Sequence, residues 1–413
     1  MKPINNVEVL LAGVPVGELI ASRQGLYFAY HSKWLQQGFN LSPLNMEFSA
    51  RPQKAADPAL FAGLPGAFAD SLPDGWGMLL MDRYFLAKLG KDRKNISPLE
   101  RLAYMADRGM GALEYRPVIE RFSDEENISI AQLYQASHAV YEGETASTLY
   151  ALRLAGGSPG GARPKVVVAL SSDAQQCSTS FKQLPPGYQH WLVKFRSPDE
   201  HRDTGAIEYA YSILAKRAGV NMAASQLISV VSSAGTERFF ATQRFDRSGD
   251  QKHHMMTASG ILYADHTAPS LDYSELLKAT NVITHHAEEV ERMARLMVFN
   301  ALTHNHDDHA KNFAFLYDQG QWLLAPAYDL TYAPIRGYAD EHTTSFMGAG
   351  LATRNTLKKV CEPFRYLKLD RYIEQTLDAL SGWPSLSREL DIAPTQQKMI
   401  QQAFDEIYKR MSS

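Results

Sequence analysis

The sequence predicts an α+β protein with two lobes, the first rich in β-strands and the second mostly α-helical. Short apolar runs separated by Gly and Pro turns dominate as far as about residue 250, which is typical of strands. Beyond that point apolar residues recur at helical spacing. With 413 residues the chain is long enough for two or three subdomains with cores of their own.

Changes in the pattern of apolar, Gly and Pro residues along the chain predict two subdomain boundaries. They define an N-terminal subdomain over residues 1–120, a β-rich subdomain over 121–250 and a helical lobe over 251–413. The connector Glu125–Tyr141 is polar and amphipathic, and the polar stretch Ser171–Gln189 is expected to be a surface loop between two strands.

Two strands and one helix are predicted in the N-terminal subdomain. Val7–Ala12 and Gly25–Tyr30 are apolar runs of strand length. Asp74–Leu89 is predicted to be helical, because four of its apolar residues recur at helical spacing: Met78, Met81, Phe85 and Leu89.

Four strands and one helix are predicted in the β-rich subdomain. The strands are β-branched or aromatic runs: Val166–Leu170, Trp191–Phe195, Leu227–Val231 and Arg238–Arg244. The stretch Ile207–Gly219 carries an apolar stripe and ends at a Gly, as a helix does.

The helical lobe contains a long amphipathic stripe followed by a predicted hairpin. The stripe consists of Val290, Met293, Ala294, Met297, Val298 and Ala301. Phe313–Tyr317 and Gln321–Leu324 are strand-length runs separated by a short turn, which indicates a β-hairpin. With Gln319 and Gly320 as loop residues, Asn312 lies across from Ala327.

The segment ALTHNHDDHAKN (residues 301–312) carries the most informative spacing. Four residues separate Asp307 from Asn312, which is the D-x-x-x-x-N spacing of a kinase catalytic loop. In that chemistry the Asp accepts the proton of the attacking hydroxyl and the Asn helps to hold Mg²⁺. The hairpin brings Asp329 back towards Asn312, and these oxygen donors suit Mg²⁺.

Three other parts of a nucleotide site have candidates. The Gly-rich stretch Ala155–Lys165 lets the backbone approach an anion closely, although a flexible Gly/Pro turn explains it equally well. Lys194 lies on the face of its strand opposite Trp191, Val193 and Phe195, and an internal Lys needs a charged partner or a phosphate. That partner is expected to be Glu208, unless Lys194 extends to solvent from an edge strand. Gln243–Phe245 end a strand where an adenine could bind backbone groups.

Two interpretations without phosphoryl transfer compete for the 301–312 segment. Its three histidines, His304, His306 and His309, could form the zinc site of a metal-dependent hydrolase. Their crowding in one short loop, without a His-x-x-x-His pair on a helix, speaks against this. The segment could also be a polar loop without chemistry.

Composition excludes several classes of protein. Net charge is −3, so overall charge gives no indication of nucleic-acid binding, and the basic run Arg354–Arg371 is more often a solvated helix face. The apolar runs are too short for a membrane span, and the N-terminus lacks the layout of a signal peptide. Two cysteines without metal spacing fit a reducing, cytoplasmic setting.

Seven segments in order resemble the HipA family of toxin–antitoxin serine/threonine kinases. They are SLPDGWGMLLMDR (71–83), GALEYRP (111–117), SPGGARPK (158–165), WLVKF (191–195), QRFDR (243–247), NHDDHAKNFAF (305–315) and LAPAYDL (324–330). They cover most of the chain. The resemblance implies a bilobal, kinase-like fold with an α/β N-terminal lobe, a β-rich nucleotide-binding part and a helical C-terminal lobe.

The resemblance also implies site residues. Asp307 would be the catalytic base, Asn312 and Asp329 the magnesium ligands, and Ser158 the regulatory autophosphorylation site. The ATP-binding residues would be Gly160, Gly161, Ala162, Arg163, Pro164, Lys165, Lys194, Gln243, Arg244, Phe245, His309, Ala310, Lys311, Asn312, Tyr328 and Asp329. Arg163-Pro164 departs from the polar residues of some family members, and a Pro there removes one N–H donor.

The implied partners are a small helix-turn-helix antitoxin of the HipB type, operator DNA reached through that antitoxin, and a protein substrate. The implied activity is ATP-dependent phosphorylation of a protein in translation, with growth arrest as the result. A non-catalytic corepressor is the alternative within the family. The presence of Asp307, Asn312, Asp329 and Lys194 speaks against it, since a corepressor has no need of the full set.

Overall fold

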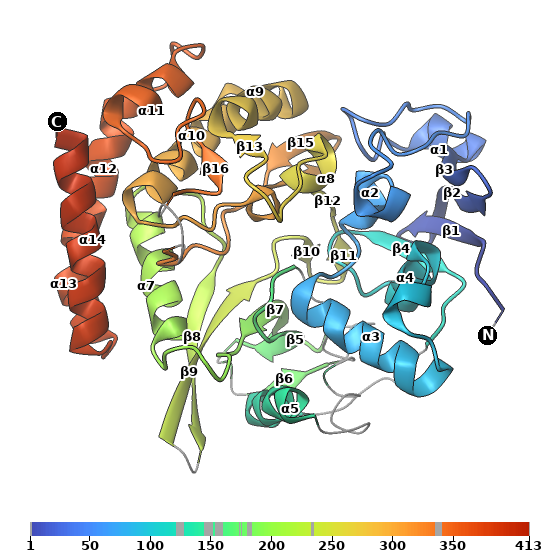
Figure 1. The fold of residues 1–413 in the computed structure, drawn as a ribbon, viewed down its shortest axis with the longest axis horizontal. Coiled ribbons are helices and arrows are strands. Elements are labelled where there is room, and N and C mark those ends of the chain that lie inside the picture. The colour runs from blue at the N-terminus through green and yellow to red at the C-terminus, as the bar shows by residue number, and fades with distance from the viewer. Residues whose placement is uncertain are drawn as a thin grey trace.

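The structure is a computed structural model that describes residues 2–120, 128–143, 152, 160–172, 174, 176–179, 184–232, 235–334 and 341–412. It has the two-lobed, mixed α and β architecture expected from the sequence (Figure 1). The N-terminal sheet and the C-terminal helix lie on opposite sides of the molecule, with the second sheet and the helical lobe between them.

The N-terminal part is built on a four-stranded antiparallel sheet in the order β3-β2-β1-β4. Its strands are β1 (Asn6–Leu11), β2 (Val14–Ser22), β3 (Gly25–Tyr30) and β4 (Leu113–Arg116). The helical elements around it are α1 (Ser32–Gln37), η1 (Phe61–Gly63), α2 (Gly66–Ala69), α3 (Gly75–Leu89), η2 (Arg93–Asn95) and α4 (Pro98–Met105). α4 begins with a capping box between Ser97 and Glu100 and has Pro98 in its first turn, which fixes its start.

A five-stranded antiparallel sheet in the order β6-β5-β7-β9-β8 forms the second part. Its strands are β5 (Lys165–Ser171), β6 (Cys177–Ser178), β7 (Tyr188–Lys194), β8 (Ser225–Ser232) and β9 (Gly235–Gln243). The helices α5 (Ile130–Glu142) and α7 (Thr204–Arg217) belong to this part. Trp191, Val193 and Phe195 enter one core cluster together, which confirms the predicted alternation along β7.

Helices dominate the C-terminal lobe, as expected. Its strands are short: β10 (Arg247–Ser248), β11 (Gln251–Lys252), β12 (His254–Thr257), β13 (Leu271–Asp272), β14 (Ala314–Asp318), β15 (Gln321–Leu324) and β16 (Thr344–Ser345). Its helical elements are α8 (Ala258–Leu262), α9 (Tyr273–Thr284), α10 (Ala287–Leu302), η3 (Ala310–Asn312), α11 (Arg354–Cys361), α12 (Leu369–Ser381), α13 (Trp383–Glu389) and α14 (Pro394–Ser412). None of the helices in the described ranges is long and apolar enough to cross a membrane.

The predicted hairpin forms with the predicted register. Phe315 faces Leu324 and Asp318 faces Gln321, which leaves Gln319 and Gly320 as the loop. The N–H of Ala325 continues the pairing by donating to the carbonyl of Ala314 (2.9 Å). Regular pairing then stops, and the N–H of Ala327 turns to the carbonyl of Asn221 at 2.7 Å.

The N-terminal part packs directly against the C-terminal lobe. Gly66 in α2 lies so close to Gly260 in α8 that a Cβ on Gly66 would clash with the Gly260 backbone. Side chains join the parts as well, since His254 hydrogen-bonds the Leu41 carbonyl at 2.9 Å. One continuous hydrophobic core runs from Val7 to Met411. The N-terminal part is therefore a structural component of the lobe that carries Asp307.

Candidate active site

A cavity between the parts collects most of the predicted site residues. Its walls come from the N-terminal segment, the five-stranded sheet and the C-terminal lobe: Asp70, Leu72, Met110, Gly160, Gly161, Lys165, Leu192, Lys194, Thr242, Gln243, Arg244, Phe245, Met255, Thr257, His309, Lys311, Asn312, Tyr328 and Asp329. Segments far apart in sequence thus converge on one site.

Lys194 is the centre of a network of charged side chains at this cavity. Its side chain is only 4% exposed, and its ammonium group forms ion pairs with both Glu208 and Asp329. Glu208 is fully buried on α7 and also accepts a hydrogen bond from Arg163 at 2.8 Å. Burial alone would lower the pKa of Lys194, but the Asp329 and Glu208 carboxylates outweigh it and raise the pKa. Lys194 is a paired internal cation, and the predicted pairing with Glu208 is confirmed.

Lys165 stands directly across the sheet from Lys194, on the neighbouring strand β5. Like charges in facing positions repel each other, so the pair needs anions nearby. Lys165 is buried, and burial lowers its pKa to about 8, although Asp329 acts in the opposite direction. Two lysines that share one cavity provide a strong site for a polyanion such as a triphosphate.

The two adjacent aspartates of the 301–312 segment have different environments. Asp308 is fully buried and accepts hydrogen bonds from the hydroxyl of Tyr273 (2.6 Å), Nδ1 of His342 (2.9 Å) and the N–H of Thr344 (3.0 Å). Asp307 is exposed. Crowding by protein atoms raises the pKa of Asp307, and the carboxylates of Asp329 and Asp308 add to the rise while His309 opposes it. Asp308 anchors the loop, and Asp307 is left available as a base.

Asn312 and Asp329 provide oxygen donors from the two ends of the hairpin. The amide of Asn312 donates to the carbonyl of Asp307 at 2.6 Å, which ties Asn312 to the 301–312 segment. Asp329 adopts a left-handed backbone with φ of 58°, a strained conformation for a residue with a side chain. Burial would raise the pKa of Asp329, but Lys194 and Lys165 hold it well below its usual range. An ionised carboxylate and an amide oxygen that line the same cavity fit Mg²⁺ chemistry.

Gln243–Phe245 lie at the cavity, as expected for an adenine-binding segment. The N–H groups of Gln243 and Arg244 donate to Ala224 (2.8 Å) and His190 (2.9 Å), so a base would bind other backbone groups of the segment. Phe245 and Tyr328 pack with a ring separation of 5.4 Å. They belong to an apolar cluster with Met110 and Met255. This cluster provides an apolar surface for a planar base.

In the described part of the Gly-rich loop, some residues line the cavity and others contact the surrounding protein. Gly160, Gly161 and Lys165 line the cavity, whereas Ala162, Arg163 and Pro164 are not among the lining residues. Arg163 instead turns its guanidinium to Glu208, and the carbonyl of Pro164 accepts from Phe195 N–H at 2.8 Å. Ala310 is buried in η3, beneath the cavity residues His309 and Lys311. Ser158 lies outside the described residues.

Two carboxylates at the site, Asp70 and Asp74, were not assigned a role from the sequence. Asp70 lines the cavity and accepts from the N–H (2.7 Å) and hydroxyl (2.8 Å) of Thr257. Asp74 accepts from the N–H of Gly161 and forms an ion pair with Lys311 at 2.8 Å. An Asp that precedes a helix usually caps it, so no local pattern indicated a contact between Asp74 and a loop 87 residues away.

Asp70 is expected to make stability depend on pH. Burial raises its pKa from 3.8 to about 6, although Lys311 and Thr257 act against the rise. Between these values the unfolded chain is ionised while the folded protein keeps its proton, so stability falls as pH rises through this window. We expect the free energy of unfolding of Asp70→Asn, relative to wild type, to increase by on the order of 2 kcal/mol between about pH 4 and about pH 7.5. Urea titrations at both pH values measure it, and a constant difference would contradict the assignment.

The three histidines of the loop do not converge. His304 stacks on His306 with 4.0 Å between ring centroids, His306 packs against His342 at 4.2 Å, and His309 lies 6.0 Å from His266. Within the described ranges no group of three His, Cys, Asp or Glu side chains is arranged to hold a metal ion. The geometry gives the zinc-hydrolase interpretation no support.

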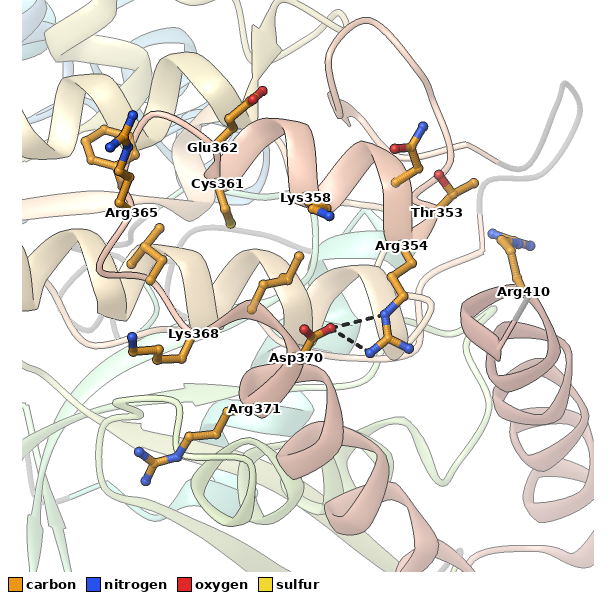
Figure 2. A pocket seen from close by; sticks show the side chains of 14 residues that line it. Thr353, Arg354, Lys358, Cys361, Glu362, Arg365, Lys368, Asp370, Arg371 and Arg410 are labelled. Carbon is orange, nitrogen blue, oxygen red and sulfur yellow. Dashed lines mark hydrogen bonds and ion pairs between the residues drawn. The ribbon is translucent and has the colours of Figure 1, made fainter.

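A second hollow, of about 1070 Å³, lies between α11 and α12 (Figure 2). The basic run forms much of its wall, and Arg410 of α14 also lines it. Arg354 pairs there with Asp370 at 2.6 Å. The basic residues of this run are exposed to solvent, as expected, and are distributed over α11, the start of α12 and the loop between them. Asp307, Lys194 and Asp329 are not among the residues that line the hollow, so it is separate from the candidate active site.

Comparison with known proteins gives partial sequence matches to two curated relatives. Y4dM of Sinorhizobium fredii, whose name describes it as a candidate kinase, is 27% identical over 151 residues, 34% of this chain and 36% of that protein. The toxin YjjJ of Escherichia coli is 25% identical over 203 residues, 46% of this chain and 42% of that protein. The chain thus spans less than half the length of either relative.

A solved structure matches nearly the whole fold. The HipA chain from the Shewanella oneidensis MR-1 complex of HipA, HipB and operator DNA superposes with a TM-score of 0.69 at 16% identity. The match covers 98% of this chain and 96% of that chain. At this identity the likeness shows the fold alone.

Family models match both parts of the chain. The HipA N-terminal domain matches residues 7–116, and the HipA-like C-terminal domain matches residues 157–412. The second match alone takes in more than half of the sequence. The chain therefore belongs to the HipA family.

Proposed function

We propose that this protein is an ATP-dependent serine/threonine kinase that acts as the toxin of a toxin–antitoxin pair. The observation that carries the proposal is the Lys194 network. An internal lysine bridges a helix glutamate, Glu208, and a candidate metal ligand, Asp329, beside a loop with the D-x-x-x-x-N spacing. This is the set of positioned charges that phosphoryl transfer requires.

Each residue of the candidate active site has a proposed role that follows from its position and charge. Lys194 and Lys165 attract the phosphates, and the apolar surface around Phe245 and Tyr328 accepts the base. Asn312 and Asp329 would hold Mg²⁺, which supplies charge neutralisation at the phosphates. Asp307 takes the proton of the substrate hydroxyl. The hydroxyl oxygen bonds to the γ-phosphorus of ATP, and the bond between the γ-phosphorus and the ADP oxygen breaks.

The partners follow from the family and from the chemistry. We propose a HipB-like helix-turn-helix antitoxin that links the toxin to operator DNA, because the Shewanella HipA structure is a complex with HipB and operator DNA. The substrate would be a protein of the translation machinery in the cytoplasm, and its phosphorylation would stop growth.

Ser158 is proposed as the site of regulatory autophosphorylation. A phosphate adds about −1.5 to −2 charges in a loop that serves to hold the anionic phosphates of ATP. We expect the modified enzyme to bind ATP poorly, and Ser158→Ala to remain active and inhibit growth more strongly than wild type. Intact-mass measurement and peptide mapping after incubation with ATP and Mg²⁺ locate the phosphate. Modification elsewhere, or normal ATP binding by the Ser158-phosphorylated protein, would rule out this form of self-silencing.

The kinase proposal is tested by quantitative phosphoproteomics of cells that express either wild type or Asp307→Asn. A site that is phosphorylated only with wild type identifies the substrate. If the two proteomes match while both proteins still repress transcription with an antitoxin, the non-catalytic corepressor is the correct function.

A further inference from the structure

Asp74 stands at the N-cap of α3 but makes no capping hydrogen bond with its side chain. Its carboxylate reaches across to the Gly-rich loop and the catalytic segment. One oxygen accepts from the N–H of Gly161, and the other lies 2.8 Å from Nζ of Lys311 and 3.5 Å from Nε2 of His266. An acid that is placed to stabilise its own helix is instead bound to two groups elsewhere in the chain.

Both groups are of the kind that binds phosphate. A backbone N–H in a Gly-rich turn and a lysine ammonium are common ligands of phosphate oxygens. Gly161 and Lys311 line the cavity, whereas Asp74 is not among its lining residues. The Asp74 carboxylate thus lies outside the cavity and accepts hydrogen bonds from two donors that line it.

The same contacts and two further ones hold the described part of the Gly-rich loop, residues 160–165, in place at the cavity. The N–H of Trp76 donates to the carbonyl of Gly161 at 3.1 Å, and Lys165 donates to the carbonyl of Gly160. Gly75 lies against the loop so closely that a Cβ would come within 2.5 Å of the Gly161 oxygen. The cavity behind the loop measures about 90 Å³. Pockets for small molecules usually measure about 300–1,000 Å³, so a nucleotide requires the loop to move.

We propose that Asp74 is an internal substitute for a nucleotide phosphate, which holds the Gly-rich loop closed until ATP displaces it. The proposal rests on the proposed function, because it makes the N-terminal part of the chain a determinant of nucleotide affinity at that site. A ligand must carry enough negative charge to replace the Asp74 carboxylate as the acceptor for the N–H of Gly161 and the ammonium of Lys311. Asp74 therefore competes with the phosphates of a triphosphate for these two donors, whereas an uncharged nucleoside has no group that would take them.

The test compares ATP with adenosine on Asp74→Asn, by calorimetry with Mg²⁺ present. Removing the charge weakens the competitor, so we expect the Kd for ATP to fall about tenfold. Adenosine has no phosphate to occupy the donors that Asp74 releases, so it gains only from the easier movement of the loop, and its Kd is expected to fall less than that for ATP. Asp82→Asn is the matched control, because Asp82 lies on the same helix, pairs with Arg101 at 2.6 Å and is 22% exposed like Asp74.

Hydrogen exchange of residues 160–165 without nucleotide tests the latch itself. We expect faster exchange in Asp74→Asn and wild-type exchange in Asp82→Asn. The proposal is overturned if exchange is unchanged in Asp74→Asn, if ATP binds no better, or if adenosine gains as much as ATP. Should unphosphorylated wild type bind no ATP at all, the kinase proposal fails, while the exchange comparison still shows whether Asp74 holds residues 160–165 in place.

Discussion

Asp307→Asn is expected to lower the rate of phosphoryl transfer by about 10²- to 10⁴-fold while the fold stays intact. The amide keeps the size of the carboxylate but cannot accept the substrate proton. Asp307 is exposed, so its loss leaves the core unchanged. Transfer of labelled phosphate from ATP and thermal unfolding of both proteins measure the two effects, and a near wild-type rate would remove Asp307 from its role.

Asp308→Asn provides the matched contrast, because the two acids are neighbours with opposite environments. Asp308 is fully buried and accepts from Tyr273, His342 and Thr344. An amide nitrogen there would face donors, so we expect a loss of about 1–3 kcal/mol of stability. Equal destabilisation by both variants would show that Asp307 also has a structural role.

Asp329→Ala is expected to remove most of the effect of Mg²⁺ on ATP affinity, about a 100-fold change. The variant loses the ionised carboxylate that Lys194 and Lys165 maintain by holding its pKa low. Asn312→Ala is expected to act in the same direction, since it removes the second proposed ligand. ATP titrations with Mg²⁺ and with EDTA give the ratio of affinities for each variant.

Asp318→Ala is the control for Asp329→Ala. It lies at the end of β14, near the turn of the same hairpin, and its side chain is 35% exposed, close to the 34% of Asp329. We expect its response to Mg²⁺ to equal that of wild type. If Asp329→Ala also responds like wild type, Asp329 does not hold the metal.

Local patterns predicted much of the fold and site because the interactions concerned are close in sequence. The two-residue turn at Gln319 and Gly320 sets the hairpin register, and the alternation along β7 places Lys194 opposite the core face. The pairing of Lys194 with Glu208 follows from a strand and the helix after it. In each case a buried charge or a turn leaves few geometric choices.

The contacts of Asp70 and Asp74 could not be predicted in this way. Asp70 meets Thr257 across 187 residues, and Asp74 meets Lys311 across 237 residues. Such pairs depend on how three parts of the chain pack, and one sequence carries no local signal of that packing. Arg163, which with Pro164 replaces the polar residues of some family members, is a similar case. It contacts Glu208 on α7 instead of lining the cavity, and no local pattern indicated this contact.

The close packing of the N-terminal part on the C-terminal lobe bears on how the protein unfolds. The two family segments look like separable modules in sequence, yet they share one continuous hydrophobic core. Removing residues 1–116 would expose apolar surface on α8 and leave Thr257 without the carboxylate that holds it. We therefore expect the two segments to unfold together, so that a perturbation that loosens either of them spreads to the walls of the candidate active site.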